Sequence, residues 1–130
     1  MTKPRLIEFP KHLDPTGTLF VADQPDLPFV PRRVFWMNGL RGKRGGHALR
    51  TDKQIIIALR GEFSVRAKRY RKSALWNLEF PHHGLYLPAM TWRVLTDFTL
   101  DSIVLVLCSR PYNPDDYIHN FDEFLLELNG

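Results

Sequence analysis

The sequence predicts an all-β protein with a short helical tail. Three observations favour this class: short apolar or alternating segments recur along the chain, turn residues separate them, and helical spacing appears only after residue 110. Some ten short strands at regular spacing indicate an antiparallel sandwich or a small barrel. A chain of 130 residues can bury a real core, so we expect one domain over residues 1–130.

The N-terminal part is expected to be extended. Residues 6–9 form a first short strand that Pro10 ends, and a polar turn over residues 14–17 leads into a second strand over residues 18–22. A proline-rich connector follows over residues 23–31, because each proline lacks a backbone donor and pushes its predecessor toward extended geometry.

The central part predicts several further strands. Residues 33–37 are aromatic and β-branched, and Asn38-Gly39 gives the turn signal after them. The apolar run over residues 53–59 indicates a strand buried on both faces and ended by Gly61. Residues 63–68 alternate apolar and polar side chains, as in a strand with one wet face. The remaining strand segments are residues 74–80, 85–87, 92–98 and 103–108.

The C-terminal end carries two helix signals. Asn113 is a capping residue followed by proline and by acidic residues, which is typical of a helix start. Residues 121–128 place their apolar side chains at helical spacing, which predicts a second helix.

Composition limits the function. The net charge of +4 is modest and the basic residues are spread over residues 32–72, which fits an anionic small ligand better than nucleic acid. A single cysteine, Cys108, excludes an internal disulfide and favours a reducing, cytoplasmic setting. No segment has the length of a signal peptide core or a membrane span, so we expect a soluble protein with no membrane partner.

A glycine-rich, basic segment over residues 41–54 is the main candidate for chemistry. It lies between two strands and delivers His47 onto a strand. Glycines allow close approach to a ligand, and arginines offer donors suited to phosphate, so the segment indicates a site for a phosphorylated small molecule. The alternative interpretation of this segment is a surface turn whose charged side chains are solvated.

Metal binding is not expected. His82 and His83 are adjacent, and adjacent strand residues point to opposite faces, so a solvent-facing turn is the favoured interpretation. His47 with Gln54 would supply one imidazole and one amide, and Leu49 cannot ligate a metal.

Six segments carry a resemblance to a known family. In order they read RVFWM (33–37), RGGHA (44–48), QIIIALRG (54–61), GLYLPAMTW (84–92), VLVLCSRPYNPDDYI (104–118) and FDEF (121–124). Together they resemble the WxcM-like sugar-nucleotide 3,4-ketoisomerases, which are metal-free cupins. The resemblance covers nearly the whole chain. It implies a jelly-roll fold, a homodimer, no cofactor, and a dTDP-linked 4-keto-6-deoxyhexose as substrate.

The resemblance also implies a reaction and a set of catalytic residues. The carbonyl of dTDP-4-keto-6-deoxyglucose moves from C-4 to C-3 through an enediolate, which needs a base and an acid. His47 is the expected base. The family motif is Arg-Gly-x-His-Ala-His. This chain has Leu49 in place of the second histidine of the motif, and it has Arg93 where the most similar members carry histidine. Tyr70 and Asp97 are candidate replacements for the missing proton carriers.

The expected substrate-binding residues follow from the same resemblance. Arg33 and Arg44 would meet the diphosphate, and Gln54 would line the pocket. Tyr86 and Trp92 would shape the sugar or base site, with core or rim aromatics as the alternative. The remaining candidates are Arg50, Arg60 and Arg93.

Two functions stay open at this stage. The first is an active isomerase that uses His47 and a partner other than histidine. The second is a catalytically silent protein that binds a dTDP-sugar or a protein partner, because loss of one member of an acid/base pair costs roughly 10²–10⁴-fold in rate. Nucleic-acid binding ranks last, since no exposed aromatic platform with interleaved basic residues is evident.

Overall fold

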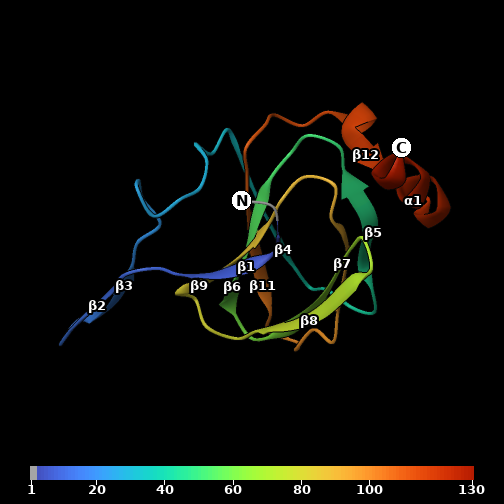
Figure 1. The fold of residues 1–130 in the computed structure, drawn as a ribbon. Coiled ribbons are helices and arrows are strands. Elements are labelled where there is room, and N and C mark those ends of the chain that lie inside the picture. The colour runs from blue at the N-terminus through green and yellow to red at the C-terminus, as the bar shows by residue number, and fades with distance from the viewer. Residues whose placement is uncertain (1–2) are drawn as a thin grey trace.

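The predicted all-β class is confirmed. The structure is a computed structural model that describes residues 3–130, so Met1 and Thr2 of the predicted domain lie outside the described residues. Within this range the strands, in chain order, are β1 Arg5–Glu8, β2 Lys11–Asp14, β3 Gly17–Phe20, β4 Arg33–Asn38, β5 Arg44–Leu49, β6 Gln54–Arg60, β7 Phe63–Arg69, β8 Lys72–Leu78, β9 His83–Leu87, β10 Trp92–Thr96, β11 Ile103–Cys108 and β12 Tyr117–Ile118 (Figure 1).

Two five-stranded antiparallel sheets face each other as a jelly-roll barrel. The first has the order β1-β9-β6-β11-β4 and the second the order β12-β5-β10-β7-β8. The neighbours are far apart in sequence: β6 pairs with β9 and β11, and β10 pairs with β5 and β7. Such pairing brings side chains from six strands to one space between the sheets.

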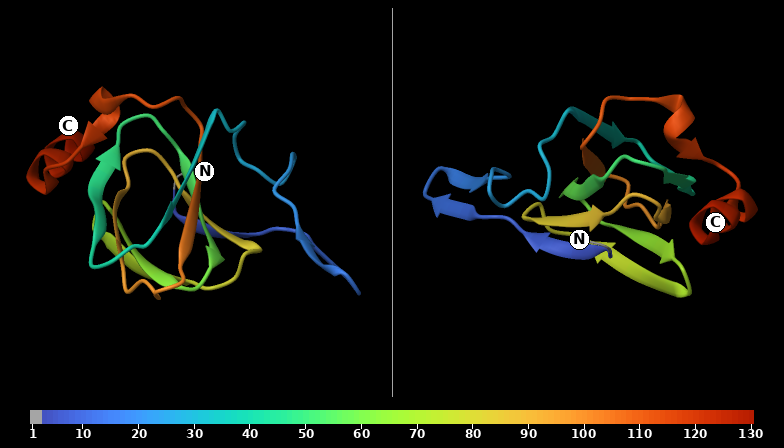
Figure 2. Two further views of the ribbon diagram at one scale, coloured as in Figure 1. Left: turned by 180° about the vertical axis from the view of Figure 1, so that it is seen from behind. Right: turned by 45° about the horizontal axis from the view of Figure 1, so that its top comes forward.

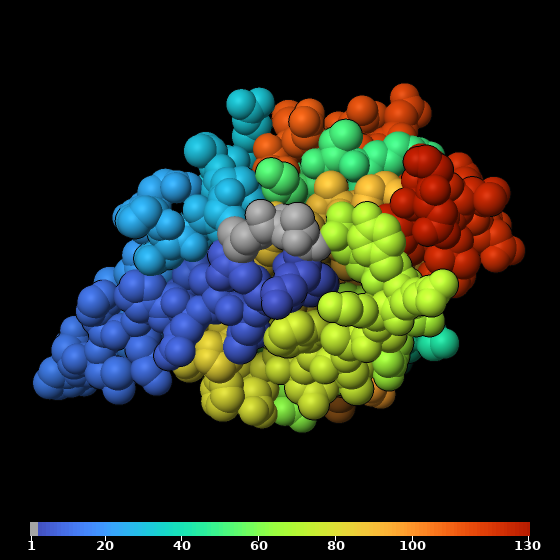
Figure 3. All heavy atoms as spheres, viewed as in Figure 1, coloured from blue at the N-terminus to red at the C-terminus, as the bar shows by residue number. Residues whose placement is uncertain are grey.

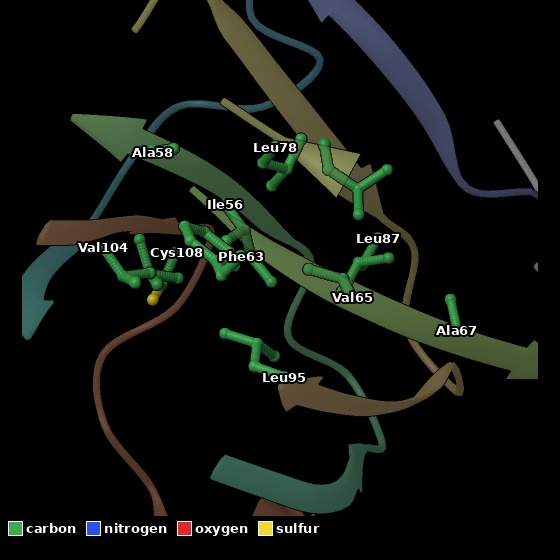
Figure 4. Close-up of a cluster of buried hydrophobic side chains, with 12 residues drawn as sticks. Ile56, Ala58, Phe63, Val65, Ala67, Leu78, Leu87, Leu95, Val104 and Cys108 are labelled. Carbon is green, nitrogen blue, oxygen red and sulfur yellow. The ribbon is translucent and has the colours of Figure 1, made fainter. Parts of the chain in front are cut away.

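The core lies between the sheets because strand side chains alternate between two faces. Ile56 and Ala58 of the first sheet meet Phe63, Val65 and Leu95 of the second (Figure 4). The other labelled members of this cluster are Ala67, Leu78, Leu87, Val104 and Cys108. Most of these side chains are less than 5% exposed, so the core holds both sheets in register.

Each sheet also has a covered outer face. On the first sheet, Ile55, Ile57 and Tyr86 pack under Leu27 and Phe29 of the proline-rich connector. On the second sheet, Ala48 and Trp92 pack against the C-terminal helix. This explains why the run over residues 53–59 is apolar on both faces, as the sequence predicted.

The C-terminal segment confirms the cap at Asn113 and the predicted second helix. Asn113 caps a single 3₁₀ turn, η1 (Pro114–Asp116), rather than a longer helix, and the Asn113 side chain accepts from the Asp115 N–H at 3.0 Å. The helix α1 (Phe121–Asn129) is capped by Asn120, whose side chain accepts from the Glu123 N–H at 2.9 Å. Neither described helix has the length and apolar character to cross a membrane.

A hairpin arm made of β2 and β3 projects from the barrel. Figures 2 and 3 show the arm on the side opposite α1. All eight of its strand residues are exposed, including Leu13 at 72% and Leu19 at 62%. The sequence predicted β3 but not β2, because residues 18–22 contain an apolar run and residues 11–14 do not.

Candidate active site

A pocket of about 320 Å³ lies between the two sheets. Arg33 comes from β4, Arg44 and His47 from β5, Gln54 from β6 and Arg93 from β10. These five residues were all predicted as site residues. The rest of the lining is Phe35, Met37, Gly45, Ile56, Leu95, Val106 and Tyr117.

A bulge in β5 determines the position of His47. The register of β5 against β10 shifts here, so that Arg93 pairs with His47 while Val94 pairs with Gly45. Gly45 and Gly46 have φ angles of 94° and 74°, which residues with a Cβ rarely adopt. The sequence predicted a loop over this segment. In the structure the strand already begins at Arg44, and the two glycines form its bulge.

His47 is held in its neutral form. Burial, the nearby Arg93 charge and His119 together lower the pKa of His47 from 6.5 to about 3, while a hydrogen bond with the Gly45 backbone acts in the opposite direction. The imidazole is therefore a free base at neutral pH. The bond to Gly45 occupies one ring nitrogen and leaves the other for a ligand.

Arg93 is a buried cation that faces the pocket. It is 2% exposed, its Nη1 donates to Gln54 Oε1 at 2.8 Å, and its Nε donates to the Thr91 carbonyl at 3.2 Å. Its Nη2 has no hydrogen-bond partner within residues 3–130. Burial lowers the pKa of Arg93 to about 10, against the opposing effect of Asp52, so the guanidinium stays charged at neutral pH.

Gln54 connects Arg93 to a buried carboxylate. The Gln54 Nε2 donates to Asp52 Oδ2 at 3.1 Å, and Asp52 is 4% exposed. Because the amide donates to Asp52 and accepts from Arg93, its orientation is fixed. The negative charge that balances Arg93 thus lies behind the amide and outside the pocket lining.

Two aromatic groups next to His47 were missed by sequence reasoning. The Tyr117 ring lies 5.0 Å from the His47 ring, and the His119 ring lies 6.0 Å from it, measured between centroids. The Tyr117 and His119 rings stack on each other at 5.6 Å. Tyr117 belongs to β12 and His119 follows it. The sequence around Tyr117 was interpreted as a helix start and as part of a family motif, but no local pattern indicates the pairing of β12 with β5.

Arg33 stacks against aromatic rings at the pocket. Its guanidinium lies 4.6 Å from the Phe35 ring and 4.9 Å from the Tyr112 ring. Stacking leaves the edge donors of a guanidinium available. Arg33 and Arg44 therefore supply the positive charge that the sequence predicted for an anionic ligand.

Four predicted site residues lie elsewhere. Arg50 holds the C-terminal segment: it donates to both carboxylate oxygens of Glu127, at 2.8 and 2.9 Å, and to the Tyr117 carbonyl at 3.2 Å. Arg60 pairs with Asp101 at 3.6 Å on the surface. Asp97 is exposed after β10. Tyr70 is 60% exposed in the β7–β8 turn, where it lines a separate groove of about 1110 Å³.

Tyr86 and Trp92 also lie outside the pocket, on the outer faces of the sheets. Tyr86 is outward because its neighbours Leu85 and Leu87 point into the core. Trp92 is outward because Arg93 points inward, and its ring meets those of Phe121 and Phe124 at 5.2 and 5.7 Å. The interpretation of both as core aromatics fits these positions.

Leu49 is buried at 1% exposure and is not among the residues that line the pocket. Leucine carries no titratable proton, so any proton transfer assigned to the second motif histidine has to come from another residue.

His82 lies in a turn, as predicted, and the two adjacent imidazoles lie close to each other. Their ring centroids lie 4.3 Å apart, because His82 belongs to a turn and only His83 belongs to β9.

The fold and the pocket together define a small cupin-like protein whose barrel encloses a neutral histidine, a buried guanidinium and further arginines. Comparison with known proteins gives the family. The chain belongs to the FdtA family (WxcM-like, C-terminal), whose model matches residues 2–129, and the family predicted from the sequence is confirmed.

Similar proteins are sugar 3,4-ketoisomerases. The TDP-4-oxo-6-deoxy-α-D-glucose-3,4-oxoisomerase of Aneurinibacillus thermoaerophilus is 30% identical over 123 residues, which cover 92% of this chain and 88% of the relative. The crystal structure of the sugar 3,4-ketoisomerase QdtA of Thermoanaerobacterium thermosaccharolyticum, in complex with TDP, has a TM-score of 0.94 and 32% identity, and the match covers 98% of this chain and 95% of QdtA. A 3,4-ketoisomerase of Helicobacter canadensis has a TM-score of 0.95 and 26% identity, with all of both chains covered.

Proposed function

We propose that this protein is a TDP-sugar 3,4-ketoisomerase that moves the carbonyl of TDP-4-keto-6-deoxyglucose from C-4 to C-3. The observation that carries the proposal is a neutral, partly buried His47 beside a buried, charged Arg93 on the neighbouring strand, in one pocket. This pair supplies the two requirements of the reaction, a base for the C-3 proton and a cation for the enediolate oxygen. The names and substrates of the relatives support the same assignment.

His47 takes the proton from C-3. The electron pair of the C–H bond forms the C-3 to C-4 double bond, and the carbonyl π electrons move onto the C-4 oxygen. His47 returns the proton to C-4, and the C-3 oxygen becomes the carbonyl. A single base suffices if His47 meets C-3 and C-4 from one face of the sugar. The depressed pKa makes His47 a weak base and its imidazolium a strong acid, and the negative charge of the bound substrate raises this pKa toward the range that proton abstraction needs.

Arg93 stabilises the enediolate. Its Nη2 has no partner within residues 3–130, and the charge develops in a water-poor pocket where a preorganised donor has its largest effect. Bonds to Gln54 and Thr91 hold the guanidinium in place before substrate arrives.

Tyr117 carries the hydroxyl proton between the two sugar oxygens. Its ring lies 5.0 Å from His47 and lines the pocket, and a phenol both donates and accepts hydrogen bonds. His119, stacked on Tyr117, positions that ring. Tyr117 and His119 replace Tyr70 and Asp97 in the proposed catalytic set, because the latter pair lies outside the pocket.

Arg33 and Arg44 bind the diphosphate, since both line the pocket and neither faces a carboxylate at ion-pair distance within residues 3–130. The protein works as a homodimer without a cofactor. Support for the dimer comes from the edge strand β4, where Trp36 is 70% exposed and Val34 is 47% exposed. The single buried Cys108 supports a cytoplasmic setting.

Proton exchange and carbonyl migration test the function. The protein is incubated with TDP-4-keto-6-deoxyglucose in deuterated water, and the sugar is followed by NMR. We expect a 3-keto product with deuterium incorporated from solvent, abolished in His47→Asn. Binding of TDP without exchange or product would identify a silent binding protein instead, and equal activity in His47→Asn would refute the role of His47.

A further inference from the structure

A second cluster of metal-ligating side chains lies outside the pocket, where β1 meets the turn before β9. Glu8 is the last residue of β1 and pairs directly with His83, the first residue of β9. The Phe9 N–H donates to the His82 carbonyl at 2.7 Å, which holds the turn against β1. None of the three ionisable residues lines the pocket of His47.

The three side chains converge on one point. One ligand atom from each of Glu8, His82 and His83 lies within 4.8 Å of the others. Two ligands of a tetrahedral zinc ion with bonds of about 2.1 Å lie about 3.4 Å apart, so a small rotation of the exposed Glu8 side chain toward the partly buried imidazoles closes the site. Their donor atoms are available, because no hydrogen bond or ion pair within residues 3–130 occupies the Glu8 carboxylate or either imidazole.

Aromatic rings restrict the two imidazoles on their other sides. The Phe80 ring lies 5.6 Å from His82 and 5.3 Å from His83, and the Phe20 ring stacks on His82 at 6.3 Å with planes 13° apart. Packing of this kind fixes ring orientation and excludes water, which favours a defined coordination geometry.

We propose that Glu8, His82 and His83 bind one divalent transition-metal ion of the zinc class. Two imidazoles and one carboxylate suit zinc, nickel and copper, whereas magnesium and calcium prefer all-oxygen sites. Water completes the coordination on the exposed side. The bound ion joins β1 to the turn before β9 and so anchors the strand from which the hairpin arm departs.

Zinc titration of untagged, chelator-treated protein tests the site. Calorimetry should give one Zn²⁺ per chain, and Co²⁺ should give visible absorption of a low-coordinate complex. The exposed, isosteric change Glu8→Gln and the change His83→Asn should each weaken Zn²⁺ binding at least about tenfold, since each removes one of three ligands. Zn²⁺ should raise the thermal midpoint of the native protein more than that of Glu8→Gln.

Two controls locate the ion. His12→Asn removes an exposed histidine of the hairpin arm and should leave Zn²⁺ affinity unchanged. His119→Asn removes a histidine next to His47 and should do the same. Circular dichroism checks that Glu8→Gln and His83→Asn are folded. Absence of Zn²⁺ binding at millimolar metal, or binding that is lost in His119→Asn and kept in Glu8→Gln, overturns the proposal.

Discussion

Because His47 is neutral in the folded protein, the pH dependence of the free energy of unfolding tests the site. The unfolded chain protonates this histidine near pH 6.5, while the folded protein resists protonation down to about pH 3. The free energy of unfolding should therefore fall as the pH drops from 6.5 toward 3, by at most about 1.4 kcal/mol per pH unit from this one group. Chemical denaturation between pH 6.5 and 4.5 measures the slope.

The comparison with His47→Asn isolates this effect. The variant should lose less stability over the same pH range, while His12→Asn, which removes an exposed histidine, should keep the native slope. Parallel curves for the native protein and His47→Asn would mean that the pKa of His47 is the same in the folded and the unfolded protein, and would refute the depressed pKa of this histidine.

Arg93 should affect the chemical step more than substrate binding. In Arg93→Lys the positive charge remains, but an ammonium cannot keep the bonds to Gln54 and Thr91 while also donating from the position of Nη2. We expect kcat to fall about 10²-fold with a small change in KM. Steady-state kinetics distinguish the roles, because a raised KM with unchanged kcat would assign Arg93 to binding alone.

At the level of elements, the β5 bulge connects the glycine pair to the position of His47. A Cβ on Gly45 would lie 3.0 Å from the Arg93 carbonyl oxygen, in a backbone conformation with φ of 94°. Gly45→Ala should lower the free energy of unfolding by about 1–3 kcal/mol and lower kcat by moving His47 relative to Arg93.

Gly39→Ala provides the matched control for this change. Gly39 also has a positive φ, of 65°, but a Cβ there meets nothing within 4 Å. Gly39→Ala should lower the free energy of unfolding without lowering kcat. Equal kinetic effects of the two alanine variants would show that the close contact at Gly45 has no part in placing His47. Denaturation curves and kcat values of the two variants decide between these outcomes.

Most strands could be predicted because their apolar patterns are local. The run that became β6 is buried on both faces, as the sequence indicated, and the run that became β7 has its apolar side chains buried, while residues 103–108 form β11 as predicted. The alternation of side chains along a strand also predicts that Trp92 and Arg93, which are adjacent on β10, cannot both face the pocket. Applied to β9, the same rule places Tyr86 outside once Leu85 and Leu87 are assigned to the core.

The rest of the site depends on contacts between distant parts of the chain. Tyr117 reaches His47 only because the two-residue strand β12 pairs with the end of β5. Arg50 points away from the pocket because Glu127, on the C-terminal helix, accepts two of its hydrogen bonds and the Asp115 carbonyl accepts a third at 2.6 Å. No pattern within either segment encodes these contacts, so the glycine-rich motif could indicate His47 but not its neighbours.

At the scale of the whole molecule, the outer face of β4 should determine the oligomeric state. Trp36 lies directly opposite Leu105 of β11, and together with Val34 they form an apolar strip at the edge of the first sheet. Trp36→Lys should convert the proposed dimer to a monomer, because the dimer would have to bury a charged lysine and would lose the apolar contact of the tryptophan. Light scattering after size exclusion measures the mass.

Leu100→Lys is the control for the change at Trp36. Leu100 is 90% exposed in the turn before β11 and does not belong to the strip. The control should keep the native mass. A native protein that is monomeric at all concentrations would refute the dimer, and a dimeric Trp36→Lys would place its interface elsewhere.

The buried carboxylates of Asp52 and Asp116 hold the loops beside the pocket through hydrogen bonds that need no ligand. Asp116 accepts from the N–H and hydroxyl of Thr51, at 2.9 and 2.7 Å, and from the Asp52 N–H at 3.0 Å. Asp52 in turn accepts from the Ser109 hydroxyl at 2.9 Å and the Arg110 N–H at 3.0 Å. Because these contacts order the loops at Thr51, Asp52, Ser109 and Arg110, we expect no closure of these loops over the substrate. Proton transfer should then be the rate-limiting step, and raising the solvent viscosity with sucrose should leave kcat unchanged.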